Sequence, residues 1–330
     1  MKKVLITGAS GFIGSFLVEE ALKRNYSVYA AIRKTSSTKY LSSKKINIVH
    51  FDFSNKNSIK KTLENSGYFH YIIHAAGIIK TCDKHEFEKV NYKFTVNFIE
   101  ALTETENIPE KFIFVSSLAA YGPGNEKNLK PVEDTGNPHP VTLYGKSKLK
   151  AENFIRSLNN FPYIILRPTG VYGPREKDYY LAFKTIKNRL EPYLATKKQH
   201  LTFLHVLDFA RLSFDALESG IKNKSYFVTD LNYYTAMEFN AIIKKLLNKK
   251  TITVVFPKWF VKPFLFLNEK ISCLFGKPTT LNSDKYNELI AKNWLCNSNG
   301  IVDDFAFSPE FNLENGVKQT IQWFKNRGLL

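Results

Sequence analysis

The sequence predicts an α/β protein built around a doubly wound parallel sheet. Short apolar segments such as 3–7 and 111–116 recur through the first half of the chain, and segments long enough for helices separate them. A glycine-rich turn follows the first apolar segment directly. Strands that are apolar throughout belong to parallel sheets with helices on both faces, and right-handed crossovers wind such sheets in both directions.

The first half of the chain supplies most of the expected elements. Strands are expected over 3–7, 27–32, 46–51, 68–75, 111–116 and 162–167, with a further strand at 226–228. Helices are expected over 15–25, 54–64 and 84–106. Ser54 is the expected N-cap of the second helix, because serine accepts hydrogen bonds from the free N–H groups of a first turn. A last helix is expected to follow Asn312 and to stop at Gly328.

The regular order ends after Pro168. The segments 174–200 and 232–312 are richer in Lys, Asn, aromatic residues and Pro. We therefore expect residues 1–173, with about 200–231, to form the sheet domain. Residues 174–199 and 232–330 are expected to form a smaller C-terminal α/β lobe that binds substrate over the carboxyl edge of the sheet.

Composition excludes several classes of protein. The chain has 330 residues, of which 44% are hydrophobic and 23% charged, as in ordinary globular proteins. No segment approaches the ~18–20 uncharged apolar residues of a membrane-spanning helix. The net charge is +17, but the lysines are scattered and no nucleic-acid-binding motif accompanies them. We expect a solvated basic surface and a small-molecule substrate, with no nucleic-acid partner.

The cysteines and histidines predict neither a disulfide framework nor a metal site. Cys82, Cys273 and Cys296 are an odd number, lie far apart and form no CxxC pair. This pattern is typical of a reduced, cytoplasmic protein. His70 and His74 stand four apart on an expected strand, which separates them by roughly 13 Å. His74 is therefore interpreted as a packed strand residue.

The turn at 7–14 reads Thr-Gly-Ala-Ser-Gly-Phe-Ile-Gly and lies between an expected strand and an expected helix. Gly8 permits the tight turn, Gly11 lets the backbone approach a pyrophosphate, and Gly14 lets helix and strand pack closely. The helix N-terminus offers free N–H groups and a positive dipole to the phosphates. The sequence therefore predicts a Rossmann-type dinucleotide site.

The ends of the next strands bear on the kind of dinucleotide. An acidic residue after the second strand would bind the ribose 2′-hydroxyl of NAD, but Arg33 stands there, and its guanidinium suits the 2′-phosphate of NADP. NADP is therefore favoured, with NAD as the alternative. Asp52 is placed to accept a hydrogen bond from the adenine amino group, with Phe53 nearby. Small residues at 75–77 let a cofactor lie against backbone.

A second constellation predicts proton transfer. Tyr144 and Lys148 are four residues apart at an expected helix start, so they share one face. A free tyrosine titrates near 10, and a neighbouring ammonium is expected to lower the pKa of Tyr144. Ser117 follows the fifth strand, where a further donor can orient a carbonyl or alcohol oxygen.

These motifs together resemble the extended short-chain dehydrogenases/reductases. That family includes nucleotide-sugar epimerases and dehydratases, dihydroflavonol reductases and 3β-hydroxysteroid dehydrogenases. The resemblance covers roughly residues 1–210 in order, with a further match near the C-terminus. The matching segments are 7–14, 74–77, 90–91, 115–117 with 121–122, 144–148, 167–174 and 205–208.

The resemblance implies roles for individual residues. Tyr144 would be the general acid/base, Lys148 would tune it and bind ribose, and Ser117 would orient the reacting oxygen. Asn91 would help to organise the proton relay, whereas Asp208 would be structural. A homodimer through the helices that carry Asn91 and Tyr144 is also implied. The expected cofactor contacts are Gly8, Gly11, Phe12, Ile13, Gly14, Arg33, Asp52, Phe53, Ala75, Ala76, Gly77, Tyr144, Lys148, Pro168 and Val171.

Three reactions share the implied hydride transfer. A dehydratase is disfavoured because Leu118 and Ala119 stand where an acidic pair is expected. A nucleotide-sugar epimerase with retained NAD would need cations for the substrate diphosphate. An NADP(H)-linked reductase or dehydrogenase is favoured, and a cofactor-sensing protein without turnover is a distant alternative. The cations available to an epimerase are Arg175, Lys177, Lys184 and Arg189.

The aromatic segment 255–267 contributes to the preference for a reductase. It suggests an apolar lobe suited to an apolar or phenolic substrate. Packing within the lobe is the favoured interpretation of these side chains. Contact with a membrane surface is the disfavoured one, although lysines flank the rings.

Overall fold

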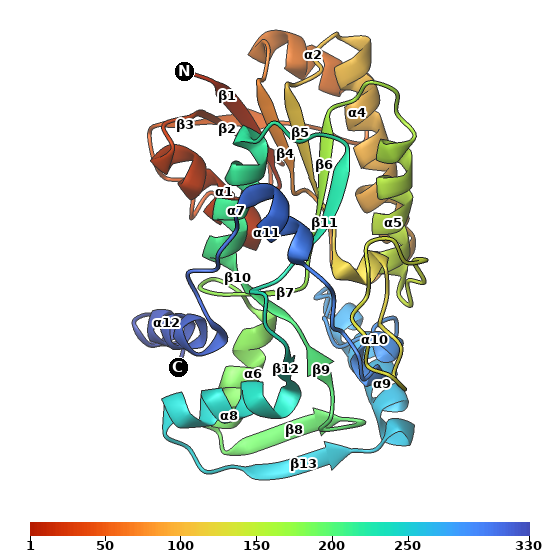
Figure 1. Cartoon of the computed structure of the whole chain (residues 1–330), viewed down its shortest axis with the longest axis vertical. Helices are drawn as coiled ribbons and strands as arrows, with labels where there is room; N and C mark the ends of the chain where they lie inside the picture. Colours follow the sequence, from red (N-terminus) through yellow and green to blue (C-terminus); the bar gives the residue numbers. More distant parts are fainter.

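The computed structural model describes residues 1–330. Its central feature is a sheet of seven parallel strands in the order β11-β6-β5-β4-β1-β2-β3 (Figure 1). The chain order reverses between β1 and β4, which confirms the predicted doubly wound sheet. The strands are β1 Lys3–Thr7, β2 Ser27–Ile32, β3 Ile46–His50, β4 Tyr71–His74, β5 Lys111–Val115, β6 Tyr163–Pro168 and β11 Lys224–Val228.

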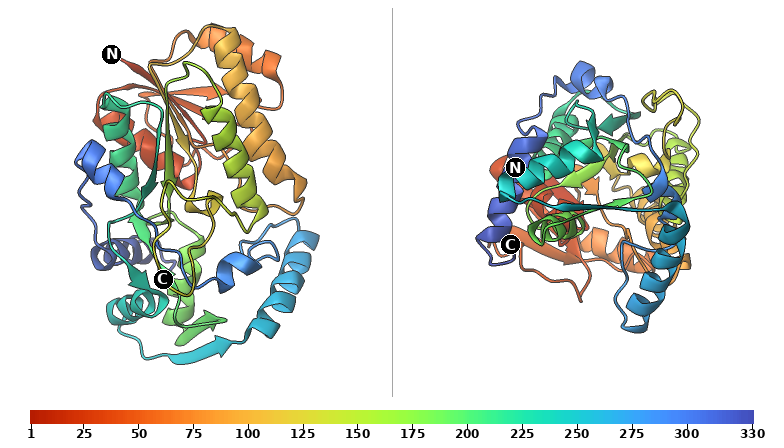
Figure 2. Two further views of the ribbon diagram at one scale, coloured as in Figure 1. Left: turned by 45° about the vertical axis from the view of Figure 1, so that its right-hand side comes forward. Right: turned by 90° about the horizontal axis from the view of Figure 1, so that it is seen from below.

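Helices cover both faces of the sheet, because its strands are apolar on both faces. Val4 and Ile6 of β1 belong to one core and Leu5 to the other. The helices α1 (Phe12–Lys23) and α7 (Val206–Glu218) pack on the first core. The second is covered by α2 (Lys56–Ser66), α4 (Phe94–Glu104) and α5 (Leu143–Arg156), of which α4 and α5 lie side by side in Figure 2.

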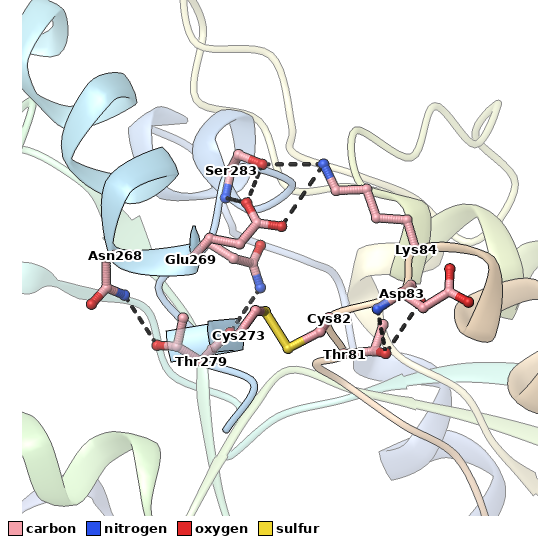
Figure 3. The surroundings of a disulfide bond; sticks show 10 residues. Thr81, Cys82, Asp83, Lys84, Asn268, Glu269, Cys273, Thr279 and Ser283 are labelled. Atoms are coloured by element: carbon pink, nitrogen blue, oxygen red, sulfur yellow. Dashed lines mark hydrogen bonds and ion pairs between the residues drawn. A yellow bond between two sulfur atoms is a disulfide. The ribbon is translucent and has the colours of Figure 1, made fainter. Parts of the chain in front are cut away.

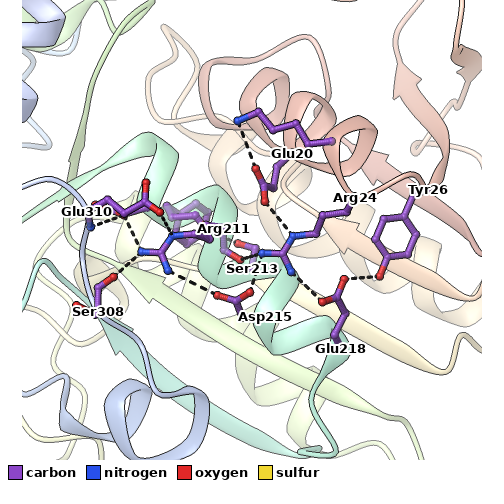
Figure 4. Close-up of polar contacts among 12 residues, drawn as sticks. Glu20, Arg24, Tyr26, Arg211, Ser213, Asp215, Glu218, Ser308 and Glu310 are labelled. Atoms are coloured by element: carbon purple, nitrogen blue, oxygen red, sulfur yellow. Dashed lines mark hydrogen bonds and ion pairs between the residues drawn. The ribbon is translucent and has the colours of Figure 1, made fainter.

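Arg24 joins the two helices of the first face. It ion-pairs with Asp215 of α7 at 2.7 Å and with Glu218 at 2.9 Å (Figure 4). Arg211 of α7 continues this network toward the C-terminal segment by donating to the carbonyl of Ser308. Asp208 accepts from the backbone N–H groups of residues 310 and 311. These contacts place the C-terminal segment against the sheet domain.

Two expected helices differ from the structure. α2 begins at Lys56, and its N-cap is Asn55, whose side chain accepts from the N–H of Ser58. The prediction of Ser54 as N-cap is wrong, because its hydroxyl donates to Asp52 instead. The expected helix 84–106 is divided into α3 (His85–Glu88), a π turn η1 (Lys89–Lys93) and α4.

The second lobe holds small sheets and helices below the carboxyl ends of the central strands (Figure 1). β7 pairs with β10, β9 with β12, and β8 with β13. Asn312 caps the last helix and Gly328 follows it with φ +65°, as predicted. Ile301 and Phe307, which lie within the range expected for the lobe, pack in the core of the sheet domain. The exact domain boundaries stay a prediction. The remaining elements are η2 Leu118–Ala120, β7 Gly170–Tyr172, α6 Asp178–Lys187, β8 Leu190–Leu194, β9 His200–Leu201, β10 Phe203–His205, β12 Tyr234–Thr235, α8 Ala236–Leu247, β13 Ile252–Phe256, α9 Lys258–Leu274, α10 Tyr286–Ile290, α11 Asn299–Phe305 and α12 Leu313–Lys325.

A disulfide joins Cys82 to Cys273 across 191 residues (Figure 3). The prediction that the cysteines form no disulfide is therefore wrong. An odd count shows only that at least one cysteine is unpaired, and that residue is the buried Cys296. The sequence does not reveal this pairing, because the loop after β4 and the end of α9 are far apart in the chain and come together only when it folds. The bond ties the sheet domain to the second lobe.

The aromatic segment 255–267 is largely exposed, which differs from the packing predicted for it. Among the residues of α9, only Val261 and Leu265 are buried. Trp259 is 77% exposed and Phe266 54%. No helix in the structure is both long and apolar enough to cross a membrane.

Candidate active site

A cavity of about 610 Å³ lies between the carboxyl ends of the central strands and the second lobe. Ser117 after β5 and both Tyr144 and Lys148 on α5 line it. The opposite wall, called the lobe wall below, consists of α6, β8, α8 and α10 of the lobe together with β10. The other predicted site residues that line this cavity are Phe12, Ile13, Ala75, Gly77, Pro168 and Val171.

The turn between β1 and α1 has the shape that a pyrophosphate requires. A Cβ added to Gly14 would lie 2.1 Å from the carbonyl oxygen of Gly8, so the helix start packs against the turn only because residue 14 is glycine. Gly11 is the N-cap of α1 and supplies no capping side chain. The N-terminal N–H groups can therefore serve an anion, and these residues fit a dinucleotide phosphate.

The end of β4 is fixed beside this turn. Thr7 is hydrogen-bonded to His74 at 2.8 Å, and its hydroxyl accepts from the N–H of Ala76 at 3.1 Å. His74 is 1% exposed and contacts Thr95 through its other ring nitrogen, so it is a packed strand residue as predicted. Burial lowers its pKa to about 3, and the histidine is neutral at physiological pH.

Tyr144 stands in the first turn of α5. Thr142 caps this helix by accepting from the N–H of Gly145 at 3.0 Å. A Cβ on Gly145 would lie 2.1 Å from the carbonyl oxygen of Ala119, so glycine lets α5 approach the segment that carries Ser117. Asp284 of the lobe also accepts from the N–H of Leu143 at 3.0 Å. The lobe thus helps to position α5.

The pKa of Tyr144 moves in the direction opposite to the expected one. Burial raises it to about 12, and the carboxylate of Glu288 adds to the rise, while the Ser117 side chain opposes it. Lys148 does not offset the effect of burial. The phenol of Tyr144 is therefore protonated at neutral pH and able to donate a proton.

Lys148 is 4% exposed, and burial lowers its pKa to about 7. Its ammonium lies 4.3 Å from the centre of the Phe114 ring. Glu152, one turn further along α5, opposes the fall in the Lys148 pKa. Glu152 is itself fully buried and bonded to Arg167 at 2.8–3.0 Å and to Ser116. The buried charge of Glu152 is therefore fully paired, one turn beyond Lys148.

Asn91 connects the loop after Gly77 to α5. Its amide donates to the carbonyl of Ile78 and to Ser147, both at 3.0 Å, and its carbonyl accepts from the N–H of Ile78 at 2.8 Å. The residue is fully buried in the π turn, a deviation that often marks functional positions in helices. Its contacts hold the 77–78 loop beside Lys148.

The remaining predicted cofactor residues lie outside the lining of the cavity. Arg33 is exposed after β2, and Asp52 is exposed after the neighbouring strand β3. Asp52 accepts from the N–H of Ser54 at 3.0 Å, which leaves its second oxygen available. Phe53 packs against Phe98 with ring centres 5.4 Å apart. Arg33 and Asp52 both lie at the carboxyl edge of the sheet, after the two strands that come next to β1 on one side.

The lobe wall is mostly apolar and carries no arginine. Leu201, Phe203, Phe239 and Trp294 line it, and none of the residues 255–267 does. The apolar character predicted for the lobe therefore comes from other segments than the aromatic one. The charged side chains of this wall are Glu176, Asp178, Lys285 and Glu288.

The four cations considered for a substrate diphosphate do not line the cavity. Arg175 lies between the rings of Phe16 and Tyr40, 4.2 Å from each ring centre, and bonds Ser15 at 2.8 Å. Its guanidinium therefore holds the segment after β7 against α1. The exposed ones are Lys177, Lys184 and Arg189.

Sequence reasoning missed three carboxylates of the site: Glu152, Asp284 and Glu288. Glu152 could have been found, because it follows Lys148 by four residues and thus shares the face of Tyr144. Asp284 and Glu288 come from the far end of the chain, and no local spacing links them to α5. Glu288 contacts Lys285 at 3.2 Å through one oxygen, and its other oxygen is buried without a partner.

Comparison with known proteins agrees with this geometry. The family model for the NAD dependent epimerase/dehydratase family matches residues 4–228. The 3β-hydroxysteroid dehydrogenase/Δ5→4-isomerase of vaccinia virus (strain Western Reserve) is 24% identical, over 97% of this chain and 98% of the viral enzyme. The UDP-glucose 4-epimerase of Vibrio cholerae is 26% identical, over 98% of this chain and 95% of that enzyme.

A solved structure shows the same fold. The dTDP-glucose 4,6-dehydratase of Bacillus anthracis, in complex with NAD, has a TM-score of 0.78 and 18% identity, and the match covers 99% of this chain and 97% of the dehydratase. The fold and site define an NAD(P)-dependent oxidoreductase of the extended short-chain dehydrogenase/reductase type. The chain belongs to the NAD-dependent epimerase/dehydratase family.

Proposed function

We propose that this enzyme is a reductase or dehydrogenase that interconverts an apolar ketone and the corresponding alcohol and releases its NADP(H) after each turnover. The observation that carries this proposal is the cavity wall opposite Tyr144, which is mostly apolar and lacks arginine. The similarity to a 3β-hydroxysteroid dehydrogenase supports a substrate with a large apolar body.

Three side chains of the sheet domain would perform the proton transfer. When bound, the nicotinamide supplies or accepts the hydride at the carbinol carbon. In the reductive direction Tyr144 donates its phenolic proton to the carbonyl oxygen, and Ser117 donates a hydrogen bond to the same oxygen. Lys148, held beside the 77–78 loop, binds the ribose. A protonated Tyr144 with a pKa of about 12 suits this direction.

The lobe wall would select a substrate without a diphosphate. Lysine or arginine side chains usually supply donors that replace the hydration of a substrate diphosphate. Lys285 is already engaged by Glu288 at 3.2 Å, and Glu176 and Asp178 add negative charge to the same wall.

A direct assay of turnover tests the substrate class. Purified protein would be given NADPH with a panel of apolar ketones, including 3-ketosteroids, and separately UDP-glucose. We expect the absorbance of the reduced nicotinamide to fall with a ketone and UDP-glucose to stay unchanged. Conversion of UDP-glucose to its 4-epimer, without any ketone reduction, would overturn the proposal in favour of an epimerase.

Arg33 would select NADP over NAD. Arg33 follows β2 and is exposed, so its guanidinium is available to a 2′-phosphate, which is expected at this strand end. Arg33→Ala is expected to weaken NADPH binding about tenfold, since a charged hydrogen bond contributes about 1.5–3 kcal/mol, and to leave NADH binding unchanged. Titration by nicotinamide fluorescence measures both. Lys34→Ala, at the neighbouring exposed lysine, is the matched control, and equal loss in both variants would contradict the role of Arg33.

A further inference from the structure

The outer side of α9 is an unusually apolar surface. Trp259, Pro263, Phe266, Leu267, Ile271 and Leu274 recur at helical spacing and therefore share one side of the helix. We call these six residues the α9 face. The exposed fractions of Trp259, Phe266 and Leu274 are 77%, 54% and 84%. α9 lies at the outer edge of the second lobe in both side views (Figures 1 and 2).

The opposite side of α9 fixes the helix in this orientation. Val261 and Leu265 are fully buried. The amide of Asn268 donates to the carbonyl of Leu281 at 2.6 Å, and Glu269 accepts from the N–H of Ser283 at 2.9 Å (Figure 3). The disulfide through Cys273 lies near the end of the same helix. These contacts hold the α9 face outward.

Within the sequence of α9 and the residues that flank it, almost all charged side chains are lysines. Residues 249–277 contain six lysines and a single carboxylate, Glu269. That carboxylate is only 13% exposed and is turned toward Ser283. Lys270 lies among the apolar residues, 5.5 Å from the centre of the Phe266 ring. The six lysines are Lys249, Lys250, Lys258, Lys262, Lys270 and Lys277.

We propose that the α9 face docks this enzyme on a membrane surface that contains anionic phospholipids. Exposed aromatic and aliphatic side chains can enter the boundary between headgroups and acyl chains, while lysines contact the anionic headgroups. A second copy of the chain is a poorer occupant, because a symmetric contact would bring the lysines of the two copies together. The proposal concerns docking on one leaflet, not spanning.

The α9 face is also connected to the active site. The segment after α9 leads to Thr280 and Lys285, which both line the cavity. A docked α9 would therefore bring the lobe wall of the cavity close to the bilayer, where apolar substrates dissolve. The docking itself does not rest on the proposed substrate, since it follows from the surface of α9 alone.

Vesicle sedimentation of the full chain tests the docking. Vesicles of phosphatidylcholine alone would be compared with vesicles that also contain phosphatidylglycerol. We expect the protein to sediment with the anionic vesicles and the Leu267→Glu/Leu274→Glu variant to bind at least tenfold more weakly. A matched control, Tyr233→Glu/Met237→Glu, makes the same change at two exposed positions elsewhere and is expected to bind within twofold of the wild type.

Two further measurements separate docking from its alternatives. The emission of Trp259 is expected to shift to shorter wavelength with anionic vesicles, and Trp259→Phe should remove most of that shift. Equal losses in the two double variants would show that binding depends only on the net charge of the protein, and this result would overturn the proposal. It would also be overturned by a dimer, detected by analytical ultracentrifugation, that only the Leu267→Glu/Leu274→Glu variant dissociates.

Discussion

The two walls of the cavity are built in different ways. The sheet wall comes from strand ends and one helix, so its residues sit in short motifs such as the Tyr144–Lys148 pair. The lobe wall draws single side chains from widely separated segments, from Glu176 to Trp294. We therefore expect the sheet wall to carry chemistry common to any substrate and the lobe wall to decide which substrate fits.

Tyr144→Phe is expected to have the largest effect, because it removes the proton donor of the sheet wall. Turnover should fall by about 10²–10⁴-fold with every substrate, the usual range for general acid catalysis, while NADPH binding survives. Steady-state rates with several ketones measure the effect, and Tyr233→Phe, at an exposed tyrosine, is the control. Unchanged turnover would assign the proton transfer to another group than Tyr144.

Cys82→Ser tests the covalent connection between the two regions. The bond closes a loop of 191 residues, and its loss is expected to lower the free energy of unfolding by about 2–5 kcal/mol in oxidising buffer. Denaturant unfolding measures this difference. Cys273→Ser should cost the same amount, and reductant should bring the wild type to the level of both variants. Three reactive thiols in the denatured, unreduced wild type would show that the bond does not form.

Ala182→Trp tests whether the lobe wall selects the substrate. Ala182 lines the cavity from α6, and an indole there would occupy space needed by a bulky substrate. We expect KM for bulky ketones to rise by at least about tenfold while kcat for small ketones is retained. Leu181→Trp, at the exposed neighbouring position, should change neither value. Loss of kcat with all ketones would show that the two walls do not act separately.

Lys148→Met is expected to change the pH dependence of stability. The pKa of Lys148 is about 7 in the folded protein and near its usual 10.5 in the unfolded chain. Between these values the unfolded chain holds one more proton, so folding stability rises with pH by up to about 1.4 kcal/mol per pH unit. The Met variant should lack this slope, whereas Lys146→Met, at an exposed lysine, should keep it. Parallel profiles for the wild type and Lys148→Met would contradict the shifted pKa.

Much of the sheet domain could be predicted from the sequence, because its signals are local. Strand periodicity gave the order of β1 to β6, and the glycine spacing located the turn before α1. The spacing of Tyr144 and Lys148 placed both side chains on one face of α5, and both line the cavity. The roles of these residues remain predictions.

The rest of the site depends on contacts between distant segments. No pattern around Asp284 or Glu288 links them to α5, and the partner of Cys82 lies 191 residues away. Burial reversed the expected direction of the Tyr144 pKa, because the sequence shows the nearby ammonium but not the loss of water. The aromatic segment was expected to pack within the lobe, but most of it is exposed. Val261 and Leu265 are the buried residues of α9, and their packing decides which side of the helix faces solvent.

The most direct test of the central claim is mass spectrometry of the nucleotide released when freshly purified protein is denatured. A reductase that exchanges its cofactor in every turnover should carry little bound nucleotide. Any nucleotide found should be mainly NADP or NADPH. Stoichiometric, tightly retained NAD would contradict the account, because it is the behaviour of an epimerase that regenerates its cofactor in place.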